Sequence, residues 1–100
     1  MRRFITLLLI LFLALPLRAS EEAIKEAADL YFNFKQQEAL EKFIELSKET
    51  GERDAFLNAV YIALELGQTR LAVDTVSMAL KKFPLDTEVL EFAGEAYLAA

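Results

Sequence analysis

Residues 54–97, DAFLNAVYIALELGQTRLAVDTVSMALKKFPLDTEVLEFAGEAY, decide the fold of this chain. The stretch reads as three helices separated by two turns, one at Gly67 and one at Pro84. In the middle helix, Ala72 and Ala79 are two helical turns apart, which places them on one face. Small residues on one face let neighbouring helices approach closely. The stretch therefore predicts helices packed side by side.

The chain before this stretch is also helical in pattern. Apolar residues from Ile24 to Tyr31 follow the i, i+3, i+4, i+7 spacing of one buried helix face. No segment alternates apolar and polar residues over the length of a strand, so we expect an all-α protein. One boundary stays open: residues 33–36 contain neither Gly nor Pro, and residues 21–49 form either one long helix or two.

Capping residues mark the other expected helix ends. Short polar side chains before an apolar periodic segment favour helix starts, whereas Gly and Pro favour stops. The expected N-caps are Ser20, Thr69 and Asp86 or Thr87, and the expected stops are Gly51, Gly67 and Pro84.

Residues 1–20 differ in composition from the rest. A basic start, Met1 to Arg3, precedes an almost wholly apolar run that ends at Leu17. This order is typical of a secretory signal peptide, cleaved after Ala19 or Ser20, and the run is too short to cross a bilayer comfortably. We therefore expect an exported protein of the periplasm or cell envelope. An uncleaved N-terminus that tethers it to the inner membrane is the alternative.

The charge balance limits the partners. The chain has 11 basic and 16 acidic residues, a net charge of −5, and three of the basic residues lie within residues 1–20. An acidic chain repels phosphate backbones, which argues against nucleic-acid binding. Protein partners with a basic or amphipathic segment are expected instead, and contact with a membrane only through the signal segment.

The chain lacks the usual agents of catalysis. It contains no His and no Cys, so general acid–base chemistry near neutral pH, thiol nucleophiles and zinc binding lose their main residues. Glu88, Glu91 and Glu95 share a helix face, but a straight helix without loop carbonyls makes a poor Ca²⁺ site, and a solvated face is the plainer interpretation. We expect no enzyme activity, no cofactor and no metal.

An internal periodicity links two segments of the chain. Ala39 and Phe43 in the first segment correspond to Ala72 and Val76 in the second. The number of residues from 39 to 72 is the same as the number from 43 to 76. We refer to this interval as the repeat interval. Each segment lies in the second helix of a predicted hairpin, so the periodicity implies hairpins stacked on one another.

With these helices and this periodicity, the chain resembles the tetratricopeptide repeat (TPR) family. The residues that carry the resemblance are Ala39, Gly67, Ala72, Ala79 and Pro84, followed by Gly94 and Tyr97. It covers residues 21–100 as units of about 21–53, 54–86 and an incomplete 87–100, which is about two and a half repeats of an α-solenoid. Three residues of the first unit depart from the pattern: Phe34 at the turn, Leu46 at a small position and Gly51 in place of the terminal proline. An unrelated α-hairpin or a Sel1-like repeat is the alternative.

The resemblance implies a partner-binding groove. In this family the first helices of successive repeats line a concave surface that holds a peptide or a partner helix. The matching positions here are Ile24, Ala28 and Tyr31, then Leu57, Tyr61, Leu64 and Glu65, then Glu88, Glu91 and Glu95. The groove is aromatic at one end and acidic at the other, although both tyrosines also suit plain packing between repeats. Some members of the family clamp a C-terminal carboxylate with Lys and Asn residues of the groove. Here only Asn58 lies near such a position and the lysines are absent, so we do not expect carboxylate clamping in this chain.

These features predict an exported adaptor or scaffold that binds protein partners in the bacterial envelope. The alternative is the N-terminal docking domain of a larger exported enzyme or envelope assembly factor. The last helix is expected to bury Leu90, Ala93, Gly94 and Tyr97, and to leave apolar surface without a second helix to cover it. We expect the natural chain to continue past residue 100, with self-association through this surface as the other possibility.

Overall fold

The computed structural model describes the backbone of residues 11–100 and the side chains of residues 21–100. The described part is all-α, as the sequence predicts. Its helices are α2 (Leu11–Phe32), α3 (Gln36–Thr50), α4 (Arg53–Glu65), α5 (Thr69–Lys82) and α6 (Thr87–Ala99).

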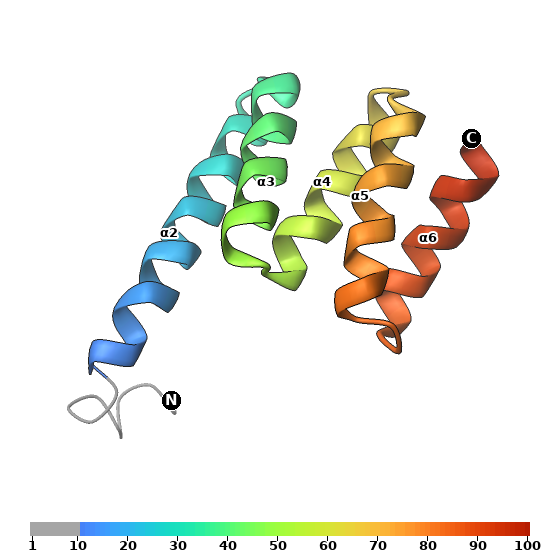
Figure 1. Cartoon of the computed structure of the whole chain (residues 1–100). Helices are drawn as coiled ribbons and strands as arrows, with labels where there is room; N and C mark the ends of the chain where they lie inside the picture. The colour runs from blue at the N-terminus through green and yellow to red at the C-terminus, as the bar shows by residue number, and fades with distance from the viewer. Residues whose placement is uncertain (1–10) are drawn as a thin grey trace.

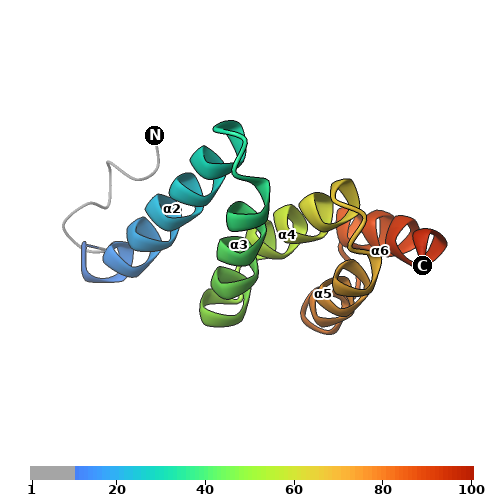
Figure 2. The same cartoon turned by 90° about the horizontal axis from the view of Figure 1, so that it is seen from above.

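The helices pack in chain order, each antiparallel to the one before it (Figure 1). Seen from above, α2, α4 and α6 lie along one side of the molecule and α3 and α5 along the other (Figure 2). The central helix α4 contacts α3, α5 and α6, whereas α2 packs chiefly on α3. Contacts are therefore mostly local, between helices that follow one another in the sequence.

The turn between α2 and α3 closes α2 with a Schellman motif. The N–H of Lys35 donates to the carbonyl of Leu30 (2.9 Å), and the N–H of Phe34 donates to the carbonyl of Tyr31 (3.0 Å). The motif needs a left-handed residue, which Phe34 supplies with a φ of 65°. The boundary left open near residues 33–36 is thus a turn.

The turn between α4 and α5 has the same bonds, one repeat interval later. The N–H of Gln68 donates to the carbonyl of Ala63 (2.8 Å), and that of Gly67 to the carbonyl of Leu64 (3.1 Å). Gly67 occupies the left-handed position with a φ of 74°. It therefore has the same backbone role as Phe34, but without a Cβ to oppose it.

Three other predicted helix ends are confirmed. Gly51 ends α3 in the left-handed conformation (φ 68°), and its N–H donates to the carbonyl of Ser47. The Asp86 side chain accepts a hydrogen bond from the N–H of Val89 at 3.1 Å and so caps α6. Helix α5 ends at Lys82, just before Phe83 and Pro84.

Two predicted caps are wrong. Ser20 lies inside α2, because the apolar residues before it continue the helix back to Leu11. Thr69 is the first residue of α5, and Gln68 holds the cap position without a side-chain capping bond. A side-chain cap is only one way to satisfy the first N–H groups of a helix, and water is another.

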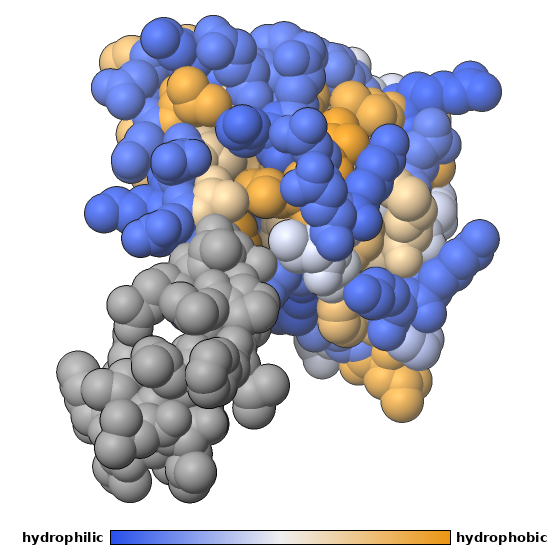
Figure 3. Space-filling view, turned by 60° about the vertical axis from the view of Figure 1, so that its left-hand side comes forward, coloured by the Kyte–Doolittle hydropathy of each residue, from blue (hydrophilic) through white to orange (hydrophobic). Residues whose placement is uncertain are grey.

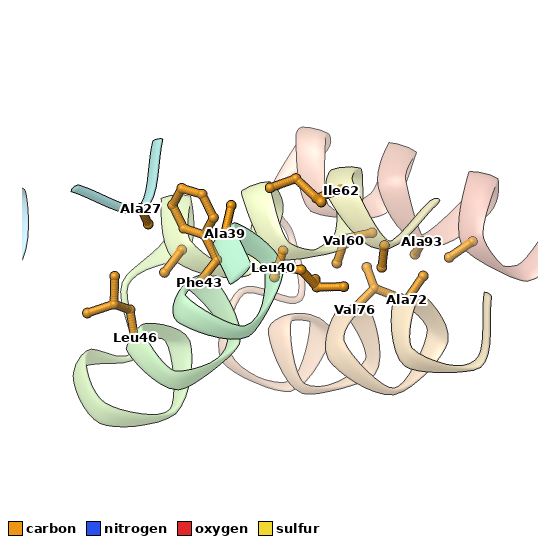
Figure 4. Packing of buried hydrophobic residues seen from close by; sticks show 14 residues of the cluster. Ala27, Ala39, Leu40, Phe43, Leu46, Val60, Ile62, Ala72, Val76 and Ala93 are labelled. Carbon is orange, nitrogen blue, oxygen red and sulfur yellow. The ribbon is translucent and has the colours of Figure 1, made fainter. Parts of the chain in front are cut away.

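The core is one continuous cluster from α2 to α6 (Figure 4). Its fully buried alanines are Ala27, Ala39, Ala55, Ala59, Ala63, Ala72 and Ala96, and its larger buried side chains include Leu40, Phe43, Val60 and Val76. Alanine at so many contact points lets the helices lie close together, and the larger side chains fill the space between them. A smaller cluster of Phe56, Leu57, Ala79 and Val89 joins α4, α5 and α6.

The buried face of α6 differs from the prediction by a shift of one position. Leu90 and Tyr97 are about half exposed and Gly94 is exposed, so only Ala93 of the four predicted positions is buried. The buried residues are Val89, Ala93 and Ala96, and they lie one repeat interval after three buried residues of α4, namely Phe56, Val60 and Ala63. Since each residue turns a helix by about 100°, the shift moves Leu90, Gly94 and Tyr97 off the packed face.

The predicted signal peptide lies only partly in the described region. Residues 1–10 are outside it, and residues 11–20 form the first part of α2. Among the described residues, no helix has both the length and the apolar composition that a membrane crossing needs.

Candidate functional site

A hollow of about 410 Å³ opens between α2 and α4, and we refer to it as the aromatic hollow. Its lining residues are Ala28, Tyr31 and Phe32 of α2, Phe43 of α3, and Asn58, Tyr61 and Ile62 of α4. Phe43 and Ile62 are buried core residues, so the floor is apolar and continuous with the core. Figure 3, which brings the α2 side of the molecule forward, shows apolar side chains in patches framed by hydrophilic ones.

Three aromatic rings crowd this hollow. The ring centroids of Tyr31 and Tyr61 are 6.4 Å apart and those of Tyr31 and Phe32 are 5.4 Å apart, both in edge-to-face arrangements. Phe32 is 73% exposed and Tyr61 is 45% exposed. An exposed phenylalanine beside two tyrosines offers apolar area at little cost in side-chain entropy, a property shared by many binding surfaces.

A carboxylate closes one side of the ring cluster. The Tyr31 hydroxyl donates to Oε1 of Glu65, at the end of α4, at 2.7 Å. This hydrogen bond, with burial and the neighbouring Tyr61 hydroxyl, raises the pKa of Tyr31 to about 12. The phenol therefore stays protonated at neutral pH and holds Glu65 beside the rings. The bond also links α2 to α4, beside the contact between the Tyr31 and Tyr61 rings.

One amide adds a polar group to the hollow. Asn58 Nδ2 donates to the carbonyl of Asp54 at 2.8 Å, so the amide is held in one orientation along α4. Its oxygen has no hydrogen-bond donor among the described residues, and so it can accept one from a ligand. The site thus combines an apolar floor, aromatic walls, one amide and one carboxylate.

The structure places the predicted groove residues in three different settings. Tyr31, Tyr61 and Glu65 come together at the aromatic hollow. Leu57 is buried in the smaller core cluster and Leu64 packs against the main core, so neither is freely available. The glutamates Glu88, Glu91 and Glu95 are exposed on α6 and line none of the described hollows.

Two residues of interest escaped the sequence analysis. Phe32 lines the aromatic hollow, and its place directly after Tyr31 near the end of an amphipathic helix was the available signal. Arg53, the first residue of α4, donates from Nε to Asp86 Oδ2 (2.5 Å) and also binds Glu88 and Asp54. The signal in that case was a pair of opposite charges, Arg53 and Asp86, separated by one repeat interval.

The Arg53 contacts join the beginnings of α4 and α6. The guanidinium and, to a smaller extent, the N–H of Val89 hold the pKa of the Asp86 carboxyl below its ordinary value. The stabilisation from this contact is therefore present above the ordinary pKa of an aspartate and is lost as the pH falls through the lowered one. The same two carboxylates, Asp86 and Glu88, raise the pKa of Arg53 above its ordinary value.

Within the described residues, no group of three or more His, Cys, Asp or Glu side chains is placed to hold a metal ion. Comparison of the chain with protein families, with curated proteins and with solved structures finds no match.

Proposed function

We propose that this protein is a protein–protein interaction module built from helical hairpins of the TPR type. Two kinds of recurrence at the repeat interval support the proposal. The paired hydrogen bonds at Phe34 recur at Gly67, and buried Ala39 recurs as buried Ala72. A buried position also recurs at this interval in α2, α4 and α6, where it is occupied by Ala27, Val60 and Ala93. Such recurrence is expected when each hairpin packs on the next in the same way.

The single observation that carries the functional proposal is the aromatic hollow. It lies between α2 and α4, which are the first helices of two successive hairpins in this interpretation, where TPR proteins hold their partners. Convergent aromatic side chains over an apolar floor are the kind of surface that supplies most of the binding energy at protein interfaces.

The charge around the hollow selects the chemistry of the partner. From Glu21 onward, α2 carries four acidic residues and one lysine. On α4, Arg53 is engaged with Asp86 at the far end, and Glu65 lies beside the rings. A partner segment with an apolar side chain for the hollow and a Lys or Arg next to it meets both features. We therefore propose an amphipathic, basic protein segment as the occupant.

Export to the bacterial envelope is part of the same proposal. It rests on the basic start and apolar run of residues 1–20. Expression of the full chain in a Gram-negative host, followed by fractionation and intact mass, tests it. A periplasmic species lacking residues 1–19 or 1–20 is expected, and an uncleaved species in the cytosol contradicts it.

Peptide selection against the immobilised protein tests the binding proposal. Peptides selected from a random library are expected to combine large apolar residues with Lys or Arg. Their affinity is then measured for the parent and for Tyr61→Ala, which removes one wall of the hollow. We expect a loss of about tenfold, typical of an aromatic anchor.

Tyr97→Ala is the matched control, because Tyr97 is 48% exposed, close to the 45% of Tyr61, and lies outside the hollow. The control is expected to bind like the parent. Failure to select any peptide, or equal losses in the two variants, argues against the hollow as the docking site. Thermal melts of both variants check that the fold is intact.

A further inference from the structure

A second hollow, of about 440 Å³, lies between the ends of α3 and α5, and we refer to it as the lysine hollow. Its lining residues are Ser47, Lys48, Glu49, Thr50 and Gly51, then Phe56, then Met78, Lys81 and Lys82. The last turns of α3 and α5 reach the same edge of the molecule, which brings these side chains together (Figure 1). The two hollows share no lining residue.

Three lysines and one glutamate, Glu49, line the lysine hollow, so its charge is positive whereas the chain as a whole is acidic. Lys48, Lys81 and Lys82 are three of the eight basic residues that follow residue 20. Within the described residues, every ion pair involves Arg53, so none of these lysines has a carboxylate partner. Lys82 Nζ donates to the carbonyl of Gly51 at 3.3 Å, which holds this lysine across the gap between the two helix ends.

The lining between the lysines is apolar. Phe56 is a buried core residue whose ring packs against Phe83 with centroids 6.4 Å apart, and Met78 is half-buried beside it. Lysines in the last turn of a helix offset the negative end of its dipole, and this explains their position along each helix. It does not explain why two such ends meet around a hollow lined by a ring and a thioether. Lysine stems can cover apolar surface while their ammonium groups stay in water.

We infer that the lysine hollow binds an acidic segment of a protein partner, with one apolar side chain of that segment seated against Phe56 and Met78. The ammonium groups of Lys48 and Lys81 pair with carboxylates on either side of that apolar residue. The overall charge of the protein favours a short acidic segment over an extended polyanion. At −5, the protein repels an anionic membrane or a nucleic acid over most of its surface, and this repulsion grows with the charge of the partner.

This inference is independent of the aromatic hollow, because it rests on other residues and on the opposite charge. If both surfaces are occupied, the domain holds a basic segment between α2 and α4 and an acidic one at the ends of α3 and α5. It then acts as a bridge between two unlike partners.

The test uses the full chain and a fluorescein-labelled peptide. The probe carries one phenylalanine flanked on each side by alternating aspartates and glutamates, and binding is followed by fluorescence anisotropy. Binding is expected to weaken as salt rises. The double variant K48Q/K81Q removes two rim charges and is expected to bind about tenfold more weakly, since each exposed ion pair contributes a factor of a few.

The matched control is K25Q/K35Q, which changes the net charge equally but alters exposed lysines outside the lysine hollow. Its affinity is expected to stay within about twofold of the parent. A probe with serine in place of phenylalanine is expected to bind more weakly than the original. Photo-methionine incorporation adds a direct readout because the chain has only two methionines, Met1 and Met78. The crosslinked probe is expected on the fragment that contains Met78.

Four outcomes overturn the inference. The first is the absence of saturable probe binding below about 1 mM, and the second is an equal loss of affinity in the two double variants. The third is a crosslink away from Met78, and the fourth is recruitment of the protein to anionic vesicles in preference to the peptide. None of these outcomes bears on the aromatic hollow.

Discussion

The turn between α2 and α3 and the turn between α4 and α5 have the same backbone but different side chains at the left-handed position. Gly67 fills that position in the second turn and Phe34 fills it in the first, with φ values of 74° and 65°. The Phe34 side chain is 91% exposed, so no packing of its ring offsets the strain. The comparison teaches that the paired hydrogen bonds and the packing of α2 on α3 impose this turn even where the sequence opposes it.

The largest expected effect comes from breaking the second hairpin. Ala72 is fully buried in the main core, and Ala72→Arg forces a long charged side chain into it. We expect a loss of about 3–5 kcal/mol in the free energy of unfolding, which removes most of the stability of so small a domain. Urea unfolding followed by circular dichroism measures it, with Asp74→Arg at an exposed position of α5 as control.

Ala39→Arg makes the same change at the matching position of the first hairpin. Ala39 is equally buried, but α2 packs chiefly on α3, so a displacement of α2 disturbs few other contacts. A smaller loss than for Ala72→Arg is therefore expected. The packing account is contradicted if Ala72→Arg unfolds at the same urea concentration as the parent.

Exchanging Phe34 and Gly67 tests directly how much strain the left-handed position imposes. Phe34→Gly relieves a strained φ and is expected to stabilise the protein by about 1 kcal/mol. Gly67→Phe is expected to destabilise it by about 1–2 kcal/mol through backbone strain alone, since a Cβ there meets no atom within 4 Å. If the two effects add, the double variant lies within about 1 kcal/mol of the parent. A larger departure would show coupling between the turns, which the hydrogen bond from Gln68 Nε2 to Gln37 Oε1 (2.5 Å) connects.

Urea midpoints of the two single variants and the exchange variant give these values. Destabilisation by Phe34→Gly would show instead that the phenylalanine ring has a stabilising role that its exposure conceals.

The smallest effect concerns the contact between the two hairpins. Because the folded pKa of Tyr31 is about 12 against an ordinary value of 10.0, its stabilising contribution is complete below pH 10 and is lost as the pH rises towards 12. Tyr31→Phe lacks the bond to Glu65 at every pH. The parent is therefore expected to unfold at higher urea than Tyr31→Phe near neutral pH, and this difference is expected to shrink above pH 10. If the parent and Tyr31→Phe differ in urea midpoint by the same amount at about pH 8 and about pH 11, the hydrogen bond from Tyr31 to Glu65 is not the cause of the difference.

The helical class and several helix ends were predictable because their causes are local. The helical periodicity of about 3.6 residues determines which residues form a helix. Gly51, Gly67 and the capping side chain of Asp86 determine helix ends within a few residues of their own positions. The same local rules failed at Ser20, because neighbouring residues continue the helix, and they left the turn at Phe34 undecided, because its residue does not favour the conformation.

The candidate site was predictable only in part. The resemblance placed Tyr31, Tyr61 and Glu65 on the same groove, and these residues do meet. The hollow that the two tyrosines line together with Phe32 depends on how α2 and α4 pack, which no short-range pattern encodes. The register of α6 was missed for a similar reason. Gly94 looks like a residue for close packing, but the buried stripe is the one that keeps the repeat interval with α4, as Ala93 does with Val60.

The helices and most of their ends follow from the sequence alone, because backbone hydrogen bonds and side-chain periodicity operate over one or two turns. Three features follow from tertiary packing instead: the buried face of α6, the contact of Arg53 between the beginnings of α4 and α6, and the two hollows of different character between the helices. Each of these depends on side chains from different helices, distant in the sequence, that come into contact only after the hairpins pack.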